Sequence, residues 1–164
     1  MELNDNAKAT YIQLLIDSLG KKHEILDELM GITSSQQAII DSDGFDEDEF
    51  LKTIDLKEEK IKSLEELDRG FEMVYDRIRD ELNDNRKEYS AQITSLKELV
   101  TAVTDLSVKL QALEKRNKSK LESILINKRK NIRTARLSNE TVANYYKTMS
   151  GKPEAQSYFY DKKK

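Results

Sequence analysis

Hydrophobic residues recur at three- and four-residue steps along the first quarter of the chain. This spacing predicts a helix from about Lys8 to Ile40 with one broad apolar face. The main stripe contains Tyr11, Leu15, Leu19, Leu26, Leu29, Ile32, Ile39 and Ile40, and it is widened by Ile12, Ile16, Ile25 and Met30. Gly20 and Gly31 lie inside the segment. We expect them to weaken the helix, or to allow close approach of a neighbouring one.

The start of a second helix is marked by a group of capping residues. Asp46 is the expected N-cap, and Glu49 three residues later completes a capping box. Phe45 and Phe50 flank this cap as a hydrophobic staple. The segment then follows a heptad seam with two polar interruptions, Lys57 and Asp68. The seam residues are Phe50, Ile54, Lys57, Ile61, Leu64, Asp68, Phe71, Tyr75, Ile78 and Leu82, and Leu51, Leu67 and Val74 broaden it.

A third helix is expected from near Arg86 to about Ala135, after a turn at residues 82–85. Its seam contains Tyr89, Ile93, Leu96, Val100, Val103, Leu110, Leu121 and Ile124, beside a stripe of Leu99, Leu106 and Leu113. The seam becomes polar at Glu114 and Asn117. From this point we expect the third helix to extend beyond the ends of the first two helices.

Ser138 is a candidate N-cap for a short fourth helix from Asn139 to about Met149, which Gly151 and Pro153 would end. The pattern therefore predicts an all-α protein. Its expected form is an elongated antiparallel three-helix bundle or coiled coil, with a C-terminal overhang and a short fourth helix. Residues 1–137 would form the long-helix bundle. Residues 138–164 would form the short helix and a flexible tail rich in aromatic and basic residues.

Composition agrees with this architecture and excludes several classes of protein. The chain has 164 residues with one proline and no cysteine, and 36% of the residues are charged. It is long enough for one domain, and it offers no disulfide scaffold or thiolate metal site. No apolar run approaches the roughly 20 residues of a membrane-spanning helix. The N-terminal segment, residues 1–5, is acidic and lacks the basic and apolar regions of a secretory signal. We expect a cytoplasmic protein that does not insert into membranes.

The net charge of -3 conceals two halves of opposite sign. Residues 1–82 hold 10 Lys/Arg and 22 Asp/Glu, a net of -12, and residues 83–164 hold 18 and 9, a net of +9. Attraction would modestly favour folding of one half on the other. Alternatively, the basic half meets an acidic partner.

Residue patterns that would indicate catalysis or metal binding are weak. His23 lies between Lys22 and Glu24, with no nucleophile placed around it by any readable pattern. A calcium loop starting at Asp41 fails because Gly44 falls at its fourth position rather than its sixth, and Lys52 at its twelfth. Glycine-rich phosphate-binding motifs are absent from the sequence. We therefore expect a protein that is not an enzyme and needs no metal or cofactor.

Basic residues cluster after the middle of the third helix, at Lys115, Arg116, Lys118, Lys120, Lys128, Arg129, Lys130, Arg133 and Arg136. Such a run is typical of nucleic-acid or acidic-lipid binding, or of a solvated helix that balances an acidic half. No nucleic-acid-binding motif accompanies the charge, so we favour the solvated helix.

Aromatic residues are concentrated near the C-terminus, where five of the eleven Phe and Tyr lie between Tyr145 and Tyr160. Aromatic side chains in a polar segment indicate docking, either on the bundle itself or on a partner protein. The candidate partner-binding residues are Ile132, Val142, Tyr145, Tyr146, Met149, Tyr158, Phe159 and Tyr160.

Three segments resemble the FlgN-type flagellar export chaperones. They are residues 35–40 (SQQAII), residues 57–71 (KEEKIKSLEELDRGF), and residues 144–149 (NYYKTM) with 158–161 (YFYD). The resemblance extends over nearly the whole chain in helix order and size. It implies a non-enzymatic chaperone that holds hook-associated proteins in the cytoplasm, prevents their premature assembly and delivers them to the export gate. The terminal helices of those substrates would be the bound segments.

Two other functions stay open at the level of the sequence. The heptad seams at Phe50–Leu82 and Tyr89–Val103 would also suit a structural scaffold or adaptor that pairs between chains as an obligate oligomer. The basic run would suit a nucleic-acid binder, which we regard as the weakest of the three.

Overall fold

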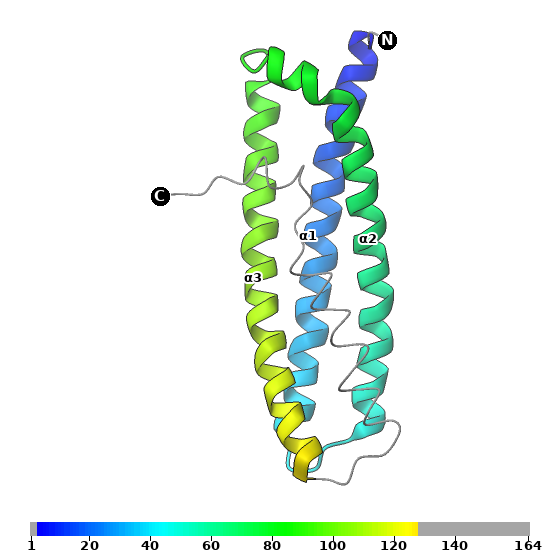
Figure 1. Cartoon of the computed structure of the whole chain (residues 1–164), viewed down its shortest axis with the longest axis vertical. Coiled ribbons are helices and arrows are strands. Elements are labelled where there is room, and N and C mark those ends of the chain that lie inside the picture. The colour runs from blue at the N-terminus through cyan, green and yellow to red at the C-terminus, as the bar shows by residue number, and fades with distance from the viewer. Residues whose placement is uncertain (1–2, 128–164) are drawn as a thin grey trace.

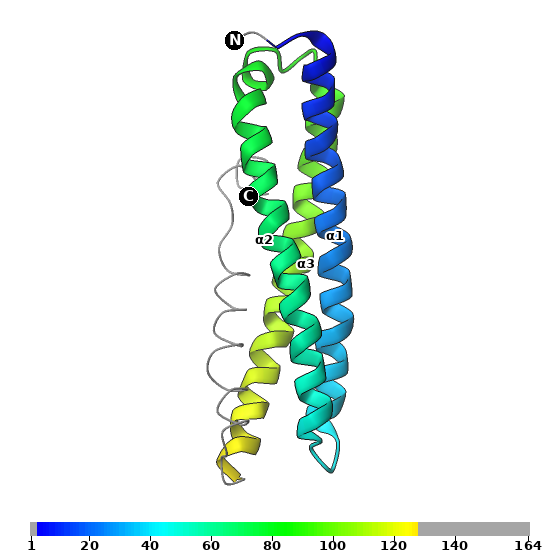
Figure 2. The same cartoon turned by 90° about the vertical axis from the view of Figure 1, so that its right-hand side faces the viewer.

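The computed structural model describes residues 3–127, which form three α-helices and contain no strand. Helix α1 spans Asp5–Asp41, α2 spans Glu47–Asp84 and α3 spans Ser90–Asn127. Figures 1 and 2 show the helices lying side by side along one long axis. At 1.5 Å per residue, the 38 residues of α2 extend about 57 Å. The prediction of an all-α helical bundle is confirmed. The predicted fourth helix lies outside the described residues.

Polar side chains at the helix starts explain where α1 and α2 begin. The Asn4 side chain accepts a hydrogen bond from the Ala7 backbone N–H at 2.7 Å, so α1 starts three residues before the predicted Lys8. Asp46 caps α2 as predicted, accepting from the Glu49 backbone N–H at 3.1 Å. The staple is also present, because the Phe45 and Phe50 rings lie 5.6 Å apart.

The link between α2 and α3 is longer than predicted. Helix α2 continues to Asp84, and α3 begins at Ser90 rather than near Arg86. The intervening residues form a turn in which the Tyr89 N–H bonds the Asn85 carbonyl at 3.2 Å. Tyr89 therefore packs against the core from the turn and not from a helical seam position.

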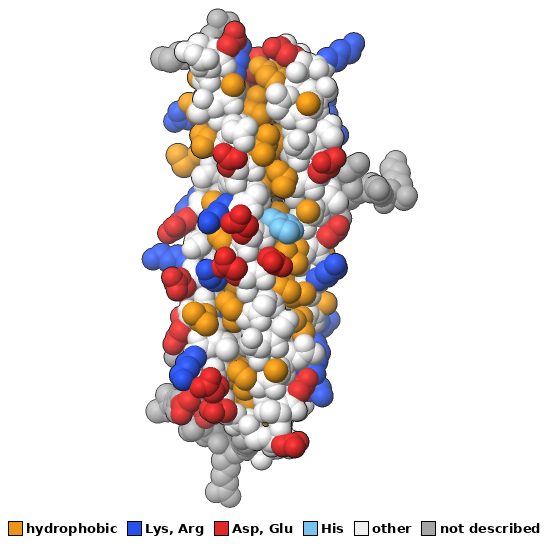
Figure 3. Space-filling model, turned by 180° about the vertical axis from the view of Figure 1, so that it is seen from behind, with side chains coloured by type: hydrophobic (Ala, Val, Ile, Leu, Met, Phe, Trp, Pro, Cys, Tyr) orange, Lys and Arg blue, Asp and Glu red, His pale blue; other side chains and the backbone are white. Residues whose placement is uncertain are grey.

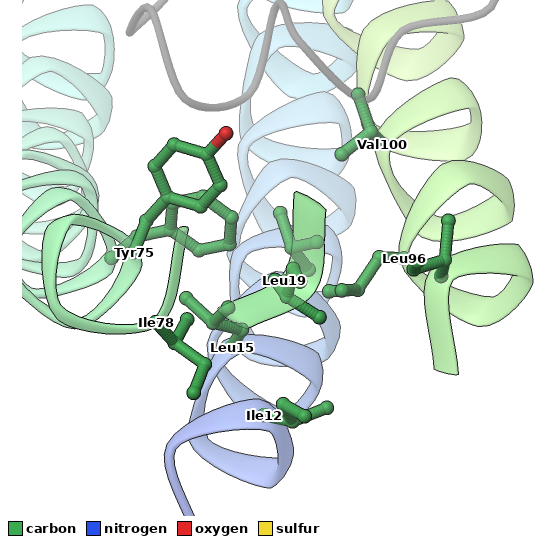
Figure 4. Close-up of a cluster of buried hydrophobic side chains, with 10 residues drawn as sticks. Ile12, Leu15, Leu19, Tyr75, Ile78, Leu96 and Val100 are labelled. Atoms are coloured by element: carbon green, nitrogen blue, oxygen red, sulfur yellow. The ribbon is translucent and has the colours of Figure 1, made fainter. Parts of the chain in front are cut away.

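The core consists of three successive apolar clusters along the bundle axis. At one end Ile12 of α1 belongs with Leu82 of α2, and at the other end Ile40 belongs with Phe50. Figure 4 shows the first cluster, in which side chains from all three helices converge. Its buried residues are Ile12, Leu15, Leu19, Phe71, Tyr75, Ile78, Leu82, Ile93, Leu96 and Val100. The predicted seams thus pack against one another within a single chain.

The expected overhang beyond Glu114 is wrong over the described residues. Leu121 and Leu125 are buried in the third cluster with Ile40, Phe50 and Ile54, so α3 stays in the bundle almost to its last described turn. Glu114 and Asn117 are themselves buried, because polar residues from the other helices meet them. The predicted extension from residue 128 to Ala135 lies outside the described residues.

The two glycines in α1 do not serve close helix packing. A Cβ atom built on Gly20 or Gly31 would meet nothing within 4 Å. The suggested close approach of a neighbouring helix at these positions is therefore wrong. Both glycines only lower the helix propensity of α1.

Candidate functional site

The eight partner-binding residues predicted from the sequence all lie outside the described residues. They are Ile132, Val142, Tyr145, Tyr146, Met149, Tyr158, Phe159 and Tyr160. The structure of residues 3–127 instead presents a candidate protein-binding surface that the sequence patterns did not single out.

This surface is a groove of about 440 Å³ between α1 and α2, which we call the α1–α2 groove. It is lined by Leu14, Ser18, Lys21 and Ile25 from α1 and by Ser63, Glu66, Leu67, Gly70, Phe71 and Val74 from α2. The lining covers eleven residue steps on each helix, which corresponds to about 16 Å of helix axis. That length accommodates three turns of a partner helix.

Residue size at the lining positions explains why the surface is hollow. Ser18 and Ser63 are small, and a Cβ atom on Gly70 would meet nothing within 4 Å. Leu14 stands at the rim with 46% of its surface exposed. Lys21 and Glu66 add one charge of each sign. An apolar hollow with few polar groups at its edge is typical of a site that takes the apolar face of a helix.

One signal in the sequence pointed toward this groove. Leu67 and Val74 broaden the seam of α2, which indicates apolar residues beyond those needed for a two-helix contact. Leu14 could have been found in the same way, since it lies beside Leu15 and one turn before Ser18. In Figure 3, hydrophobic side chains form interrupted stripes on the side of the molecule opposite to that of Figure 1, with charged groups between them. His23, the single histidine of the sequence, lies on this face and is half-buried.

A second feature is a layer of buried polar residues between the second and third apolar clusters, which we call the polar layer. Lys57 of α2 donates to the Glu114 carboxylate of α3 and to Gln36 Oε1 of α1, the latter at 2.8 Å. Thr33 Oγ1 also donates to Glu114 at 2.8 Å. The layer thus joins all three helices. Its members are Thr33, Gln36, Thr53, Lys57, Glu114 and Asn117, all buried.

The edge of the polar layer is closed by an arginine. Arg116 donates to Asn117 Oδ1 at 3.0 Å and pairs with both carboxylate oxygens of Asp41, at 2.7 and 2.6 Å. Asn117 Nδ2 in turn donates to the Thr33 carbonyl at 3.1 Å. Part of the basic run predicted from the sequence is therefore paired with an acidic residue of α1 at the partly exposed edge of the bundle.

Burial and pairing act in opposite directions on the lysine of the polar layer. Burial lowers the pKa of Lys57, and the Glu114 carboxylate beside it opposes that shift. A buried pair of this kind contributes little net stability compared with apolar residues of the same size. Its physical effect is to fix the register of the three helices, because any shift leaves a buried charge without its counterpart.

The second polar interruption of the α2 seam is matched in the same way. Asp68 accepts from Lys22 Nζ at 2.8 Å, and Lys22 is itself buried on α1. Near the start of α1, Glu81 Oε1 accepts from the Tyr89 hydroxyl at 3.1 Å and pairs with Lys8 Nζ at 3.2 Å. Desolvation and the bond to Glu81 raise the pKa of Tyr89 to about 12. The Lys22–Asp68 and Lys8–Glu81 contacts connect α1 with α2, whereas the Tyr89–Glu81 bond connects the turn before α3 with the end of α2.

Residues 3–127 contain neither a candidate metal site nor a candidate membrane span. No group of three or more His, Asp or Glu residues in this range is placed to hold a metal ion. None of the three helices combines the length and the apolar character needed to cross a membrane.

Comparison of the chain with protein-family models, curated proteins and solved structures finds no match.

Proposed function

We propose that the chain is an export chaperone of the FlgN type that binds a terminal amphipathic helix of a hook-associated protein in the cytoplasm. The proposal rests on the resemblance of residues 35–40, 57–71, 144–149 and 158–161 to that family. The structural observation that supports it is the α1–α2 groove, which offers apolar surface over the length of three helical turns.

A chaperone of this kind needs a rigid surface and a reversible interface. The interleaved clusters and the polar layer hold α1 and α2 in one register, so the groove is formed before a partner arrives. An amphipathic segment that folds as it binds loses entropy, which keeps the affinity moderate. While bound, its apolar face is withheld from premature assembly, and the complex can be released at the export gate.

The finer architecture is part of this proposal. We take the bundle as antiparallel, supported by the pairing of Ile12 with Leu82 and of Ile40 with Phe50. A short helix at residues 139–149 and a division of the chain near residue 137 complete the arrangement. The protein would act without a catalytic step, a cofactor or nucleic acid.

The scaffold function is less well supported by the packing. It requires the seams at Phe50–Leu82 and Tyr89–Val103 to pair between chains, whereas both seams are buried against α1 in one chain. Multi-angle light scattering distinguishes the two functions. An obligate extended dimer or tetramer favours the scaffold, and a monomer or weak dimer favours the chaperone.

The groove is tested with a matched pair of exposed apolar residues. Leu14→Glu places a charge at the rim of the groove, and Val108→Glu places one on α3, at a residue with 57% exposure that does not line it. Binding of purified hook-associated proteins and of their terminal-helix peptides is measured by titration calorimetry. We expect Leu14→Glu to cost about 2 kcal/mol, or roughly thirtyfold in Kd, and Val108→Glu to leave Kd unchanged.

Equal affinities of both variants for every hook-associated protein would remove the groove from the proposed site. The C-terminal aromatics are tested separately with the Tyr145→Ala, Tyr146→Ala double variant. If that variant binds with unchanged affinity, these two tyrosines are not part of the interface.

A further inference from the structure

The three pairs of helices are not packed equally closely. Helix α1 packs along both α2 and α3, whereas the backbones of α2 and α3 approach each other only at isolated points. Figure 1 shows α2 and α3 on either side of α1. Directly packed helices lie 8–10 Å apart, and a closed three-helix bundle would bring all three pairs to that spacing. We call the side between α2 and α3 the α2–α3 face. The three helices of residues 3–127 thus occupy three positions of a four-helix arrangement, and the fourth position lies on this face.

One edge of the α2–α3 face is acidic. Helix α2 carries 7 Lys/Arg and 14 Asp/Glu, a net of -7. Glu58, Glu65 and Glu72 recur every seven residues, so they form one row along the helix beside the seam row of Ile61 and Tyr75. In Figure 4, Tyr75 of α2 and Val100 of α3 lie on opposite sides, with Leu15 and Leu19 of α1 between them. A helix on this face would meet apolar side chains flanked by acidic ones.

The chain itself supplies a segment with the complementary pattern. The sequence continues for 37 residues after Asn127, from 128 to 164. Residues 128–136 contain five Lys/Arg and no acidic residue. Ile132 within this stretch and Val142, Tyr146 and Met149 after it fall in one heptad frame. The segment thus combines a basic start with an apolar stripe at helical spacing.

The end of α3 lies where such a segment can enter the α2–α3 face. Leu125 belongs to the third cluster with Phe50 and Ile54, so the last described turn of α3 lies beside the start of α2. A helix of 25 residues extends about 37 Å, which is two thirds of the length of α2. The remaining residues suffice for a reversing turn and a short tail.

We infer that residues 128–164 fold back along the α2–α3 face and occupy the fourth position of the bundle. The basic residues lie against the acidic first half of α2, and the aromatic residues lie further along the same helix. A helix formed by the start of this segment would run in the same direction as α2, and both helices rise by the same distance per residue. Tyr146 is therefore level with Asp68 when Arg136 is level with Glu58. This placement does not depend on the export function.

The absence of cysteine from the sequence makes a cross-linking test direct. Arg136→Cys is combined with Glu58→Cys in the full chain, and a short bismaleimide is added at low protein concentration. The control combines Arg136→Cys with Asp27→Cys. Asp27 is exposed on α1 at the height where Glu28 pairs with Lys60, so both pairs remove one acidic residue at a similar level of the bundle. We expect at least tenfold more intramolecular product from the Glu58 pair, identified by mass spectrometry of the digest.

A second variant tests the charge complementarity. Adding Arg129→Glu and Arg133→Glu to the Glu58 pair should lower the intramolecular yield severalfold, and a further Asp55→Lys, Glu65→Lys change should restore it. Equal yields from the Glu58 and Asp27 pairs would overturn the inference. Product that joins two chains would also overturn it, because a second copy would then occupy the α2–α3 face.

Discussion

The buried pair of Lys57 and Glu114 gives the sharpest prediction for stability. These side chains are 4% and 5% exposed, and Glu114 also accepts from Thr33. Glu114→Ala removes the carboxylate that pairs with the buried Lys57 ammonium and keeps the bond from Lys57 to Gln36 Oε1. Removal of one partner of a buried ion pair costs about 3–5 kcal/mol of unfolding free energy. That is a large part of the 5–15 kcal/mol that typically holds a domain together.

Two further variants separate this effect from ordinary truncation. Lys57→Met combined with Glu114→Leu removes both charges and keeps similar volumes, so we expect stability within about 1 kcal/mol of the native protein or higher. Glu24→Ala is the surface control, because Glu24 and its partner Lys21 are both well exposed. An exposed pair contributes about 0.2–1 kcal/mol.

Urea denaturation followed by circular dichroism at 222 nm measures all three variants. The pH dependence provides an independent check on the cause. Without Glu114 the pKa of Lys57 falls further below its ordinary value, because the carboxylate was the group that opposed the effect of burial. Above that lowered pKa the folded state releases the proton while the unfolded state keeps it up to about pH 10.4, so stability rises with pH.

The deficit of Glu114→Ala should therefore shrink as the pH is raised from 7 toward 10. A deficit below 1 kcal/mol at pH 7 would refute the assignment of a large desolvation cost to this pair. So would a deficit that stays constant over this range, since the cost would then not arise from the charge on Lys57.

Three smaller effects follow from local structure. Gly31→Ala should raise the unfolding free energy by about 0.5–1 kcal/mol, because the added methyl group meets nothing and the helix propensity improves; a thermal melt that shows no gain contradicts this. Asp46→Ala should lower it by about 1 kcal/mol through loss of the α2 cap, and Asp46→Asn should retain most of that stability in the same melt. Tyr89→Phe should be less stable than the native protein below about pH 10. Folded Tyr89 has its pKa raised to about 12, so its stabilising contribution is complete below the unfolded pKa and is lost between pH 10 and 12. A stability difference that persists unchanged at pH 12 would count against that coupling.

Much of the fold could be read from periodicity, because amphipathic helices repeat their apolar residues at the helical period. Eight of the ten predicted seam residues of α2 are buried, together with Thr53, which was not predicted. The N-cap Asp46 and the staple of Phe45 and Phe50 were predicted correctly. The end of the α3 seam was less accurate, since Leu125 is buried where Ile124 was expected. A helix of 3.6 residues per turn drifts against a heptad frame, and the sequence does not show how far the partner helices follow that drift.

The candidate groove illustrates what a pattern cannot show. Leu67 and Val74 were recognised as extra apolar positions, but a hollow surface depends on Ser18, Ser63 and Gly70 from two helices meeting at the same height. Those heights are set by the register between α1 and α2. Register is a property of the packed bundle and not of either helix alone.

The polar residues in the seams show most clearly which features are local to the sequence and which depend on the packed bundle. By itself, the sequence determined an all-helical chain with three long amphipathic segments, because the hydrophobic period and the capping residues are local properties. It placed Lys57, Asp68, Glu114 and Asn117 at core spacing but offered no way to choose between an exposed overhang and a buried contact. Only the tertiary structure decided this, by bringing Lys57 to Glu114 and Asp68 to Lys22 across helices. The physical reason is that a buried charge is tolerated only beside its counterpart, and which residues become counterparts depends on how the helices are set against one another.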